Sequence, residues 1–381
     1  MATQFEVKTV ALGTAATETI TTGFQGKGVI LWTHAKTTTG ESSGASFGIC
    51  FADGTTIRYI NAAGDNGGAT TNVGRGYNIG DGGVPGFILT DGAPTSLAGS
   101  LITNVAFNAA PNMVITFDAT HTTGYYISYV LFGGADTTNV KAGANVILTT
   151  DSGSKSFTGV GFQPDAVFFA SGQNTTDAGQ TVASFKMNLG FATKPASVKQ
   201  WALATTVRDA ASTSATVDGM SLLRSDACIM GMVLAGTDYF EAGFLQPTSD
   251  GYDLNIVTAP SANNYFIYLA IKGGQWDAGV QAKPTGAATQ TFNVAFTPKG
   301  IGFVMSSPTV IETLTSEAIV TMGAWDGTNE AYAGAYHNDA INTVAKSSLE
   351  SIKVLHEMNT TTGADGTTLA ANTVITWDAA G

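Results

Sequence analysis

The sequence predicts an all-β protein built of three tandem β-sandwich or jelly-roll-like modules, the third of which is truncated at its C-terminal strand. Three observations support this prediction. Short apolar segments rich in aromatic and β-branched residues alternate with turns, and the chain has 46 glycines among its 381 residues. Only 12% of the residues are charged, which is about half the fraction of an average soluble domain. Four sequence phrases also recur in the same order along the chain.

The composition excludes several classes of protein. A hydrophobic content of 44% argues against disorder, and Cys50 and Cys228 alone cannot form a disulfide scaffold, so we expect two buried free thiols. A net charge of −12 disfavours a nucleic-acid partner. The first residues, 1–7, lack the features of a signal peptide, and no apolar run is long enough to span a bilayer. We therefore expect folding in a reducing cytoplasm and no membrane partner.

Two phrases occur three times each. The first reads TGFQGKGVIL at 22–31, VGFQPDAVFF at 160–169 and VAFTPKGIGF at 294–303. Its phenylalanines lie 138 and then 134 positions apart (Phe24, Phe162 and Phe296). The second is an aromatic residue 27 to 29 positions further along (Phe51, Phe191 and Trp325). Ordered landmarks at matching offsets indicate an internal repeat.

Two more phrases complete the repeat. VITFDA at 114–119 returns as VITWDA at 374–379, with YDLNIV at 252–257 in the middle copy. YYISYVLFGG at 125–134 matches YFIYLAIKGG at 265–274, an offset of 140, and has no third copy. We infer three modules with the boundaries 1–138, 139–278 and 279–381, and we expect the last to lack its closing strand.

The strands follow from local pattern. Residues 125–131 are apolar on both faces, which is typical of a central strand buried on both sides. Residues 345–358 carry a weak helical pattern, but they align with 225–233 of the middle copy, so a strand is favoured. An edge left without its neighbour recruits another strand. We expect a neighbouring subunit or the N-terminal segment of the chain itself to fill that edge.

A search for catalytic and metal-binding patterns favours structural roles. Residues Gly44–Gly48 fit Gly-x-Ser-x-Gly, but they precede a strand and not a helix, so a turn into that strand is favoured over a hydrolase site. The four histidines lack the spacing of a metal site (His34, His121, His337 and His356). We predict no catalytic, cofactor-binding or metal-binding residues and no cofactor.

Two further groups have a structural and a functional interpretation. The acidic loop Asp326–Glu330 could hold a cation, but it lacks the spaced carboxylates of an EF-hand, so turn formation is favoured. Four tyrosines could form a platform for sugar rings (Tyr125, Tyr129, Tyr265 and Tyr268). Because they lie on the most apolar segments, packing in the core is favoured.

Two segments of the middle module resemble a known family. FTGVGFQPDAV at 157–167 and YFIYLAIKGG at 265–274, the latter preceded by DGYDLN at 250–255, resemble a repeat module of virion structural proteins of tailed bacteriophages. The resemblance covers the middle module almost throughout, is partial in the first and is weakest in the third. It implies a virion component and transfers no catalytic residue.

The resemblance and the composition together predict a non-enzymatic bacteriophage virion structural protein, either a capsid decoration, a capsid-associated or a tail-associated component. We expect it to assemble with itself as a homo-oligomer, and with other virion proteins, through sheet edges and apolar faces. The alternative is a receptor-binding or carbohydrate-binding fibre or adhesin module, with a host-surface glycan as its partner. An enzyme such as a depolymerase would need a clustered pair of carboxylates.

Overall fold

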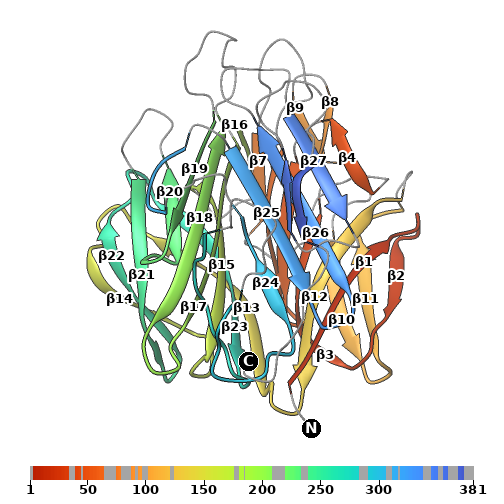
Figure 1. Cartoon of the computed structure of the whole chain (residues 1–381), viewed down its shortest axis with the longest axis horizontal. Coiled ribbons are helices and arrows are strands. Elements are labelled where there is room, and N and C mark those ends of the chain that lie inside the picture. Colours follow the sequence, from red (N-terminus) through yellow and green to blue (C-terminus); the bar gives the residue numbers. More distant parts are fainter. Residues whose placement is uncertain are drawn as a thin grey trace.

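The fold is described from a computed structural model, drawn in Figure 1. All statements below concern the residues that it describes, which are 3–33, 39–43, 46–63, 74–78, 87–90, 93–96, 102–120, 124–175, 180–183, 185–207, 219–232, 239–282, 291–305, 311–315, 318–337, 345–350, 355–358 and 368–372. Every regular element among them is a β-strand, and every pairing between strands is antiparallel. The predicted all-β fold class is confirmed.

The first part of the chain forms a sandwich of two antiparallel sheets. The larger, which we call the N-terminal sheet, has the strand order β1 (Thr3–Ala11), β12 (Tyr126–Gly134), β3 (Gly26–Thr33), β5 (Ser46–Ala52), β6 (Ile57–Ala63), β7 (Gly74–Asn78) and β16 (Gln180–Ala183). The smaller has the order β10 (Ile102–Asn108), β11 (Asn112–Phe117) and β2 (Thr17–Thr21). A separate hairpin pairs β8 (Phe87–Thr90) with β9 (Ala93–Ser96).

The next part of the chain forms a second sandwich. Its larger sheet, the middle sheet, has the order β13 (Asn139–Ile147), β23 (Asn264–Lys272), β15 (Ala166–Asn174), β17 (Phe185–Thr193), β18 (Lys199–Val207) and β19 (Gly219–Arg224). Its smaller sheet has the order β14 (Gly153–Thr158), β22 (Gly251–Thr258), β21 (Tyr239–Thr248) and β20 (Ile229–Met232). Taken in chain order, the six strands of the middle sheet are arranged as the first six strands of the N-terminal sheet are.

The C-terminal sheet has the order β24 (Ile301–Phe303), β25 (Ala318–Trp325), β26 (Glu330–His337), β27 (Ala345–Glu350) and β4 (Gly40–Ser43). The remaining pair is β28 (Leu355–Met358) with β29 (Thr368–Asn372). The segment 345–358, for which sequence patterns offered a helix or a strand, contains β27 and β28, so the preference for strand is confirmed for 345–350 and 355–358, and 351–354 lie outside the described residues. The module boundaries after 138 and 278 stay our interpretation of the repeated strand order.

The N-terminal and middle sheets are each buried on both faces. One face packs on the small sheet of its own sandwich, and β12 contributes Tyr129 and Leu131 to that core. The other face packs on the other two large sheets in a core that all three share. There β12 contributes Val130 and Phe132, so the prediction of a central strand apolar on both faces is confirmed. In Figure 1 the light blue strands of the C-terminal sheet lie between the green strands of the middle sheet and the red and orange strands of the N-terminal sheet.

The sheets also exchange edge strands in a ring. β16, from the second sandwich, extends the N-terminal sheet at β7. β4, from the first sandwich, extends the C-terminal sheet at β27. Thr315, from the segment before β25, bridges to Ser221 of β19 at the edge of the middle sheet. At one end of each large sheet, the edge strand therefore pairs with a segment of another part of the chain, which reduces the unpaired edge that the sheet presents.

One expectation about the incomplete edge was wrong. The N-terminal segment does not fill it, because Thr3–Ala11 pair along their whole length with β12 of the N-terminal sheet. The C-terminal sheet has no described strand on the outer side of β24, where β12 and β23 lie in the other two sheets. The physical reason is that β1 already pairs with β12, the closing strand of its own sheet. β13 pairs with β23 in the same way in the middle sheet.

Candidate functional site

The phrase that carries the family resemblance forms a cradle for one carboxylate. The backbone N–H groups of Gly159 and Gly161 donate to Asp250, at 3.1 and 2.6 Å from its two carboxylate oxygens. The N–H of Val160, between them, donates to the Asp250 carbonyl oxygen at 3.2 Å. The two glycines have φ angles of 89° and 87°, a conformation that glycine adopts without the steric cost of a Cβ atom. The two glycines of the phrase thus favour the backbone conformation of this turn.

The same phrase also holds the closing strand. The N–H of Asp165 donates to the carbonyl oxygen of Ile271 at 2.8 Å, and its carboxylate accepts the N–H of Gly273 at 2.6 Å. Its carbonyl oxygen accepts the hydroxyl of Thr193 at 2.7 Å. The two segments that carry the resemblance, 157–167 and 265–274, and the turn at Asp250 that precedes the second therefore meet at one end of the middle sandwich. Polar groups of each segment form hydrogen bonds with backbone groups of another segment.

Asp250→Ala removes the acceptor of the two glycine N–H groups. Because the turn is exposed, we expect the free energy of unfolding to fall by about 1 kcal/mol, which is less than the roughly 1.5–3 kcal/mol of hydrogen bonds to a charged group. Chemical denaturation measures this loss, and Asp250→Asn, which keeps a side-chain oxygen as acceptor, is the control with a smaller expected loss. An Asp250→Ala chain as stable as the unsubstituted chain would contradict the role of the cradle.

Two aspartates in matching turns join neighbouring sheets. Asp53 follows β5, and its carboxylate accepts the N–H groups of Thr55 and Thr56 at 2.9 and 2.7 Å. The other oxygen of that carboxylate accepts the N–H of Ala142 on β13 at 3.0 Å. A turn carboxylate of the first sandwich thus captures a backbone donor at the edge strand of the middle sheet.

Asp326, which follows β25, does the same one sheet further round. Its carboxylate accepts the N–H groups of Thr328 and Asn329 at 2.9 and 2.7 Å, and the N–H of Val7 on β1 at 2.8 Å. The turn interpretation of the acidic loop Asp326–Glu330 is confirmed. Sequence reasoning did not identify either aspartate as a joint between sheets. The repeated words Asp-Gly-Thr at 53–55 and 326–328 were the available signal.

The seam between the middle and C-terminal sheets is polar. The Ile319 carbonyl oxygen accepts the hydroxyl of Thr205 at 2.6 Å, and the Ile319 N–H donates to the hydroxyl of Ser221 at 2.8 Å. Nearby, Arg224 forms ion pairs with Asp226 at 2.7 Å and with Glu241 at 3.2 Å. The Arg224 guanidinium lowers the pKa of the Asp226 carboxyl, whereas burial raises the pKa of the Glu241 carboxyl. The hydroxyl groups thus form hydrogen bonds with backbone groups, and the charged side chains form ion pairs with one another.

The residues considered from the sequence are dispersed. Ser46 begins β5, and Phe47 and Gly48 continue it, so the strand interpretation is confirmed for these three, while Gly44 and Ala45 lie outside the described residues. His34 and His121 also lie outside them, and His337 and His356 lie on β26 and β28. Three of the four tyrosines are buried, namely Tyr125, Tyr129 and Tyr268. Tyr265 is partly buried against the shared core, so all four pack as predicted. Within the described ranges, no group of three or more His, Cys, Asp or Glu residues could hold a metal ion.

Both cysteines are free and buried, as the sequence predicts. Burial raises the pKa of each thiol well above its usual range, so the reactive thiolate form is suppressed. We expect a thiol-specific reagent at pH 8 to label neither Cys50 nor Cys228 in the folded chain, and to label both in denaturant. Mass spectrometry after timed quenching measures the labelling. Rapid labelling of the folded chain would contradict the burial of these thiols.

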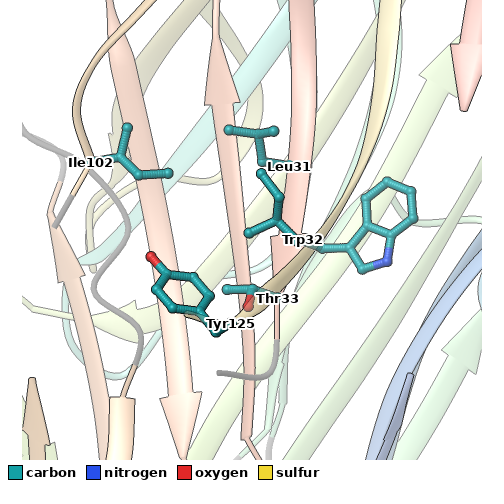
Figure 2. A pocket seen from close by; sticks show the side chains of 6 residues that line it. Leu31, Trp32, Thr33, Ile102 and Tyr125 are labelled. Carbon is teal, nitrogen blue, oxygen red and sulfur yellow. The ribbon is translucent and has the colours of Figure 1, made fainter. Parts of the chain in front are cut away.

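One described cavity lies inside the first sandwich (Figure 2). Its volume of about 10 Å³ has room for about one water molecule. It is lined mainly by apolar side chains (Leu31, Trp32, Thr33, Ile102, Tyr125 and Ile127). Figure 2 shows the Tyr125 ring and Ile102 at one side of the cavity and the Trp32 indole directed away from it. A space of this size is a packing defect, too small for a substrate.

Comparison with known proteins gives no family assignment. No family model, curated protein or solved structure matches the chain. Among the described elements, none is a helix that could cross a membrane. The function therefore has to be argued from the residues, the resemblance of the two phrases and the arrangement of the sheets.

Proposed function

We propose that this chain is a non-enzymatic structural component of a bacteriophage particle, as a capsid decoration, a capsid-associated or a tail-associated protein. It would act as a preformed block and contribute packing surface and not chemistry. The observation that carries the proposal is that its aspartate side chains are engaged in hydrogen bonds with the backbone. Asp53, Asp165, Asp250 and Asp326 each accept backbone N–H groups that fix turns or join sheets.

The shared core supports the same proposal. Apolar side chains of all three large sheets meet in it, and two exchanged strands and one isolated bridge connect the sheets at their edges. Such an arrangement resists relative movement of its parts, because any displacement would expose apolar surface and break ladder hydrogen bonds. A particle component that is held by many weak contacts benefits from that rigidity.

The fibre or adhesin alternative needs aromatic side chains on the surface to stack on sugar rings. Among the described side chains, Phe292 is the one exposed aromatic that is large and hydrophobic, with 43% of its surface accessible. The buried tyrosines of β12 and β23 are committed to cores. The described surface therefore favours the structural component over a glycan-binding platform.

The experiment is mass spectrometry and cryo-EM of purified phage particles whose genome encodes this chain. We expect the chain in intact particles, in a fixed copy number and with density that fits three large sheets around one core. Particles that lack the chain altogether would contradict the proposal. Chain density confined to a distal tip, together with binding of the purified chain to host glycans, would favour the adhesin.

A further inference from the structure

The outer edge of β24 differs from its counterparts in the other two sheets. β3 and β15 each lie between two neighbours, with β12 and β23 on the side that corresponds to the outer edge of β24. In the described residues β24 pairs with β25 alone. The residues of β3 are buried except for Lys27, whereas Ile301 and Phe303 are only half-buried and Gly302 is exposed.

The same edge adjoins apolar surface that is partly covered. The Phe303 ring packs edge-on against Phe292 with 6.0 Å between the ring centroids, and Phe292 is itself exposed. Gly300, just before β24, is covered by the Phe5 ring, because a Cβ atom at Gly300 would lie 2.1 Å from it. A side chain of the N-terminal sheet thus covers Gly300, and the next three residues, 301–303, form β24 with its outer edge.

The edge is also continuous with the shared core. In the N-terminal and middle sheets, the strand at this position directs one face into that core, with Val130 and Phe132 from β12 and with Ile267, Leu269 and Ile271 from β23. Among the side chains whose burial is described, the C-terminal sheet contributes its buried members from β25 and β26. An added strand would therefore extend an interface that the other two sheets already form.

We propose that the outer edge of β24 accepts one extended segment of another polypeptide as an antiparallel strand. This inference rests on the proposed function, and it names the partner as a particle protein with such a segment. The segment would carry apolar or aromatic side chains on both faces, as β12 and β23 do. Main-chain hydrogen bonds would supply affinity, and the alternating side chains would supply specificity.

A second copy of this chain is not the expected donor. The described strands with the required pattern, β12 and β23, are central in their own sheets and fully paired on both sides. Releasing either one would expose both of its apolar faces to water. By contrast, the edges of β1 and β13 each have an N–H group captured by Asp326 or Asp53, so they are less open to an added strand.

The test uses the full chain and a synthetic peptide with the sequence of residues 264–274. The control peptide carries Ile267→Pro and Leu269→Pro, because proline cannot donate a ladder hydrogen bond. Hydrogen exchange measured by mass spectrometry reports on residues 301–303. We expect the first peptide to slow exchange there by about tenfold or more, and the proline peptide to leave it unchanged.

Two variants of the full chain sharpen the test. We expect Ile301→Pro to abolish the effect of the peptide, because a proline in β24 removes a backbone N–H and disturbs the regular backbone along which an added strand has to pair. Lys299→Ala keeps all backbone donors and should retain the effect. Thermal unfolding of both variants shows whether they are folded.

Three outcomes would overturn the inference. They are unchanged exchange at 301–303 with the first peptide, equal slowing by the proline peptide, and slowing without peptide that rises with the concentration of the chain. The last outcome would identify a second copy as the occupant. None of them depends on whether the chain occurs in phage particles, so failure of the strand acceptor can be distinguished from failure of the proposed function.

Discussion

Gly190→Ala is expected to lower the free energy of unfolding by about 3 kcal/mol or more, since a misfit of this kind cannot be relieved by side-chain movement. Gly190 lies on β17, where a Cβ atom would stand 1.8 Å from the Cys228 carbonyl oxygen and 3.3 Å from that of Trp201. Both obstacles are backbone atoms, so the two sheets of the second sandwich would have to separate locally. Chemical denaturation of the purified variant measures the loss.

Gly302→Ala is the matched control, because it places the same methyl group on a strand with open space around it. The nearest atom to a Cβ at Gly302 is the Gly323 carbonyl oxygen at 3.9 Å. We expect a change within about 0.5 kcal/mol, as for most exposed sites. Equal losses from the two substitutions would mean that the close approach of β17 to Cys228 does not govern stability.

Phe132→Ala is expected to lower the free energy of unfolding by about 3–5 kcal/mol, the range for a large aromatic side chain removed from a packed core. Phe132 is 1% exposed. Its ring centroid lies 5.5 Å from that of Phe5, 5.9 Å from that of Phe168 and 5.8 Å from that of Trp276. The ring thus connects the N-terminal sheet to the middle sheet and to the segment that follows it.

The control for this substitution is Phe292→Ala, which removes the same ring from the surface. We expect a loss of about 1 kcal/mol or less, because Phe292 keeps 43% of its surface accessible and has one aromatic neighbour, Phe303. Thermal unfolding of both variants gives the comparison. A small effect of Phe132→Ala would show that the large sheets do not depend on one another through this core.

The elements of the fold follow closely from sequence. The both-face apolar pattern of 125–131 correctly gives β12 a central place, since a strand between two layers must satisfy a core on each side. The repeat alignment correctly assigns 345–350 and 355–358, the described parts of the segment 345–358, to strands, where local periodicity alone is ambiguous. Burial of Cys50 and Cys228 follows from their positions in apolar segments.

The contacts between the sheets do not follow from sequence patterns. β4 and β27 pair although Gly40–Ser43 and Ala345–Glu350 are about 300 positions apart in the chain. The four residues of β4, one glycine, one glutamate and two serines, carry no pattern that predicts which sheet edge they will pair with. The joints at Asp53 and Asp326 look like ordinary Asp-Gly turns, because the captured N–H groups of Ala142 and Val7 belong to distant strands.

The place of the N-terminal segment illustrates the same limit. Edge recruitment is a sound principle, but several strands of one chain can compete for an edge. Thr3–Ala11 have a better partner in β12, where nine consecutive residues pair in register. Local pattern gives the type of each strand, and the choice between partners depends on the whole arrangement.

The union of the three large sheets in one body is tested most directly by differential scanning calorimetry of the intact chain. We expect a single transition whose calorimetric enthalpy equals its van't Hoff enthalpy, because the shared core and the exchanged strands make the sheets unfold together. Two or three separated transitions, or a calorimetric enthalpy well above the van't Hoff value, would contradict it. The sheets would then be independent modules in series, and not the rigid block on which the proposed structural role depends.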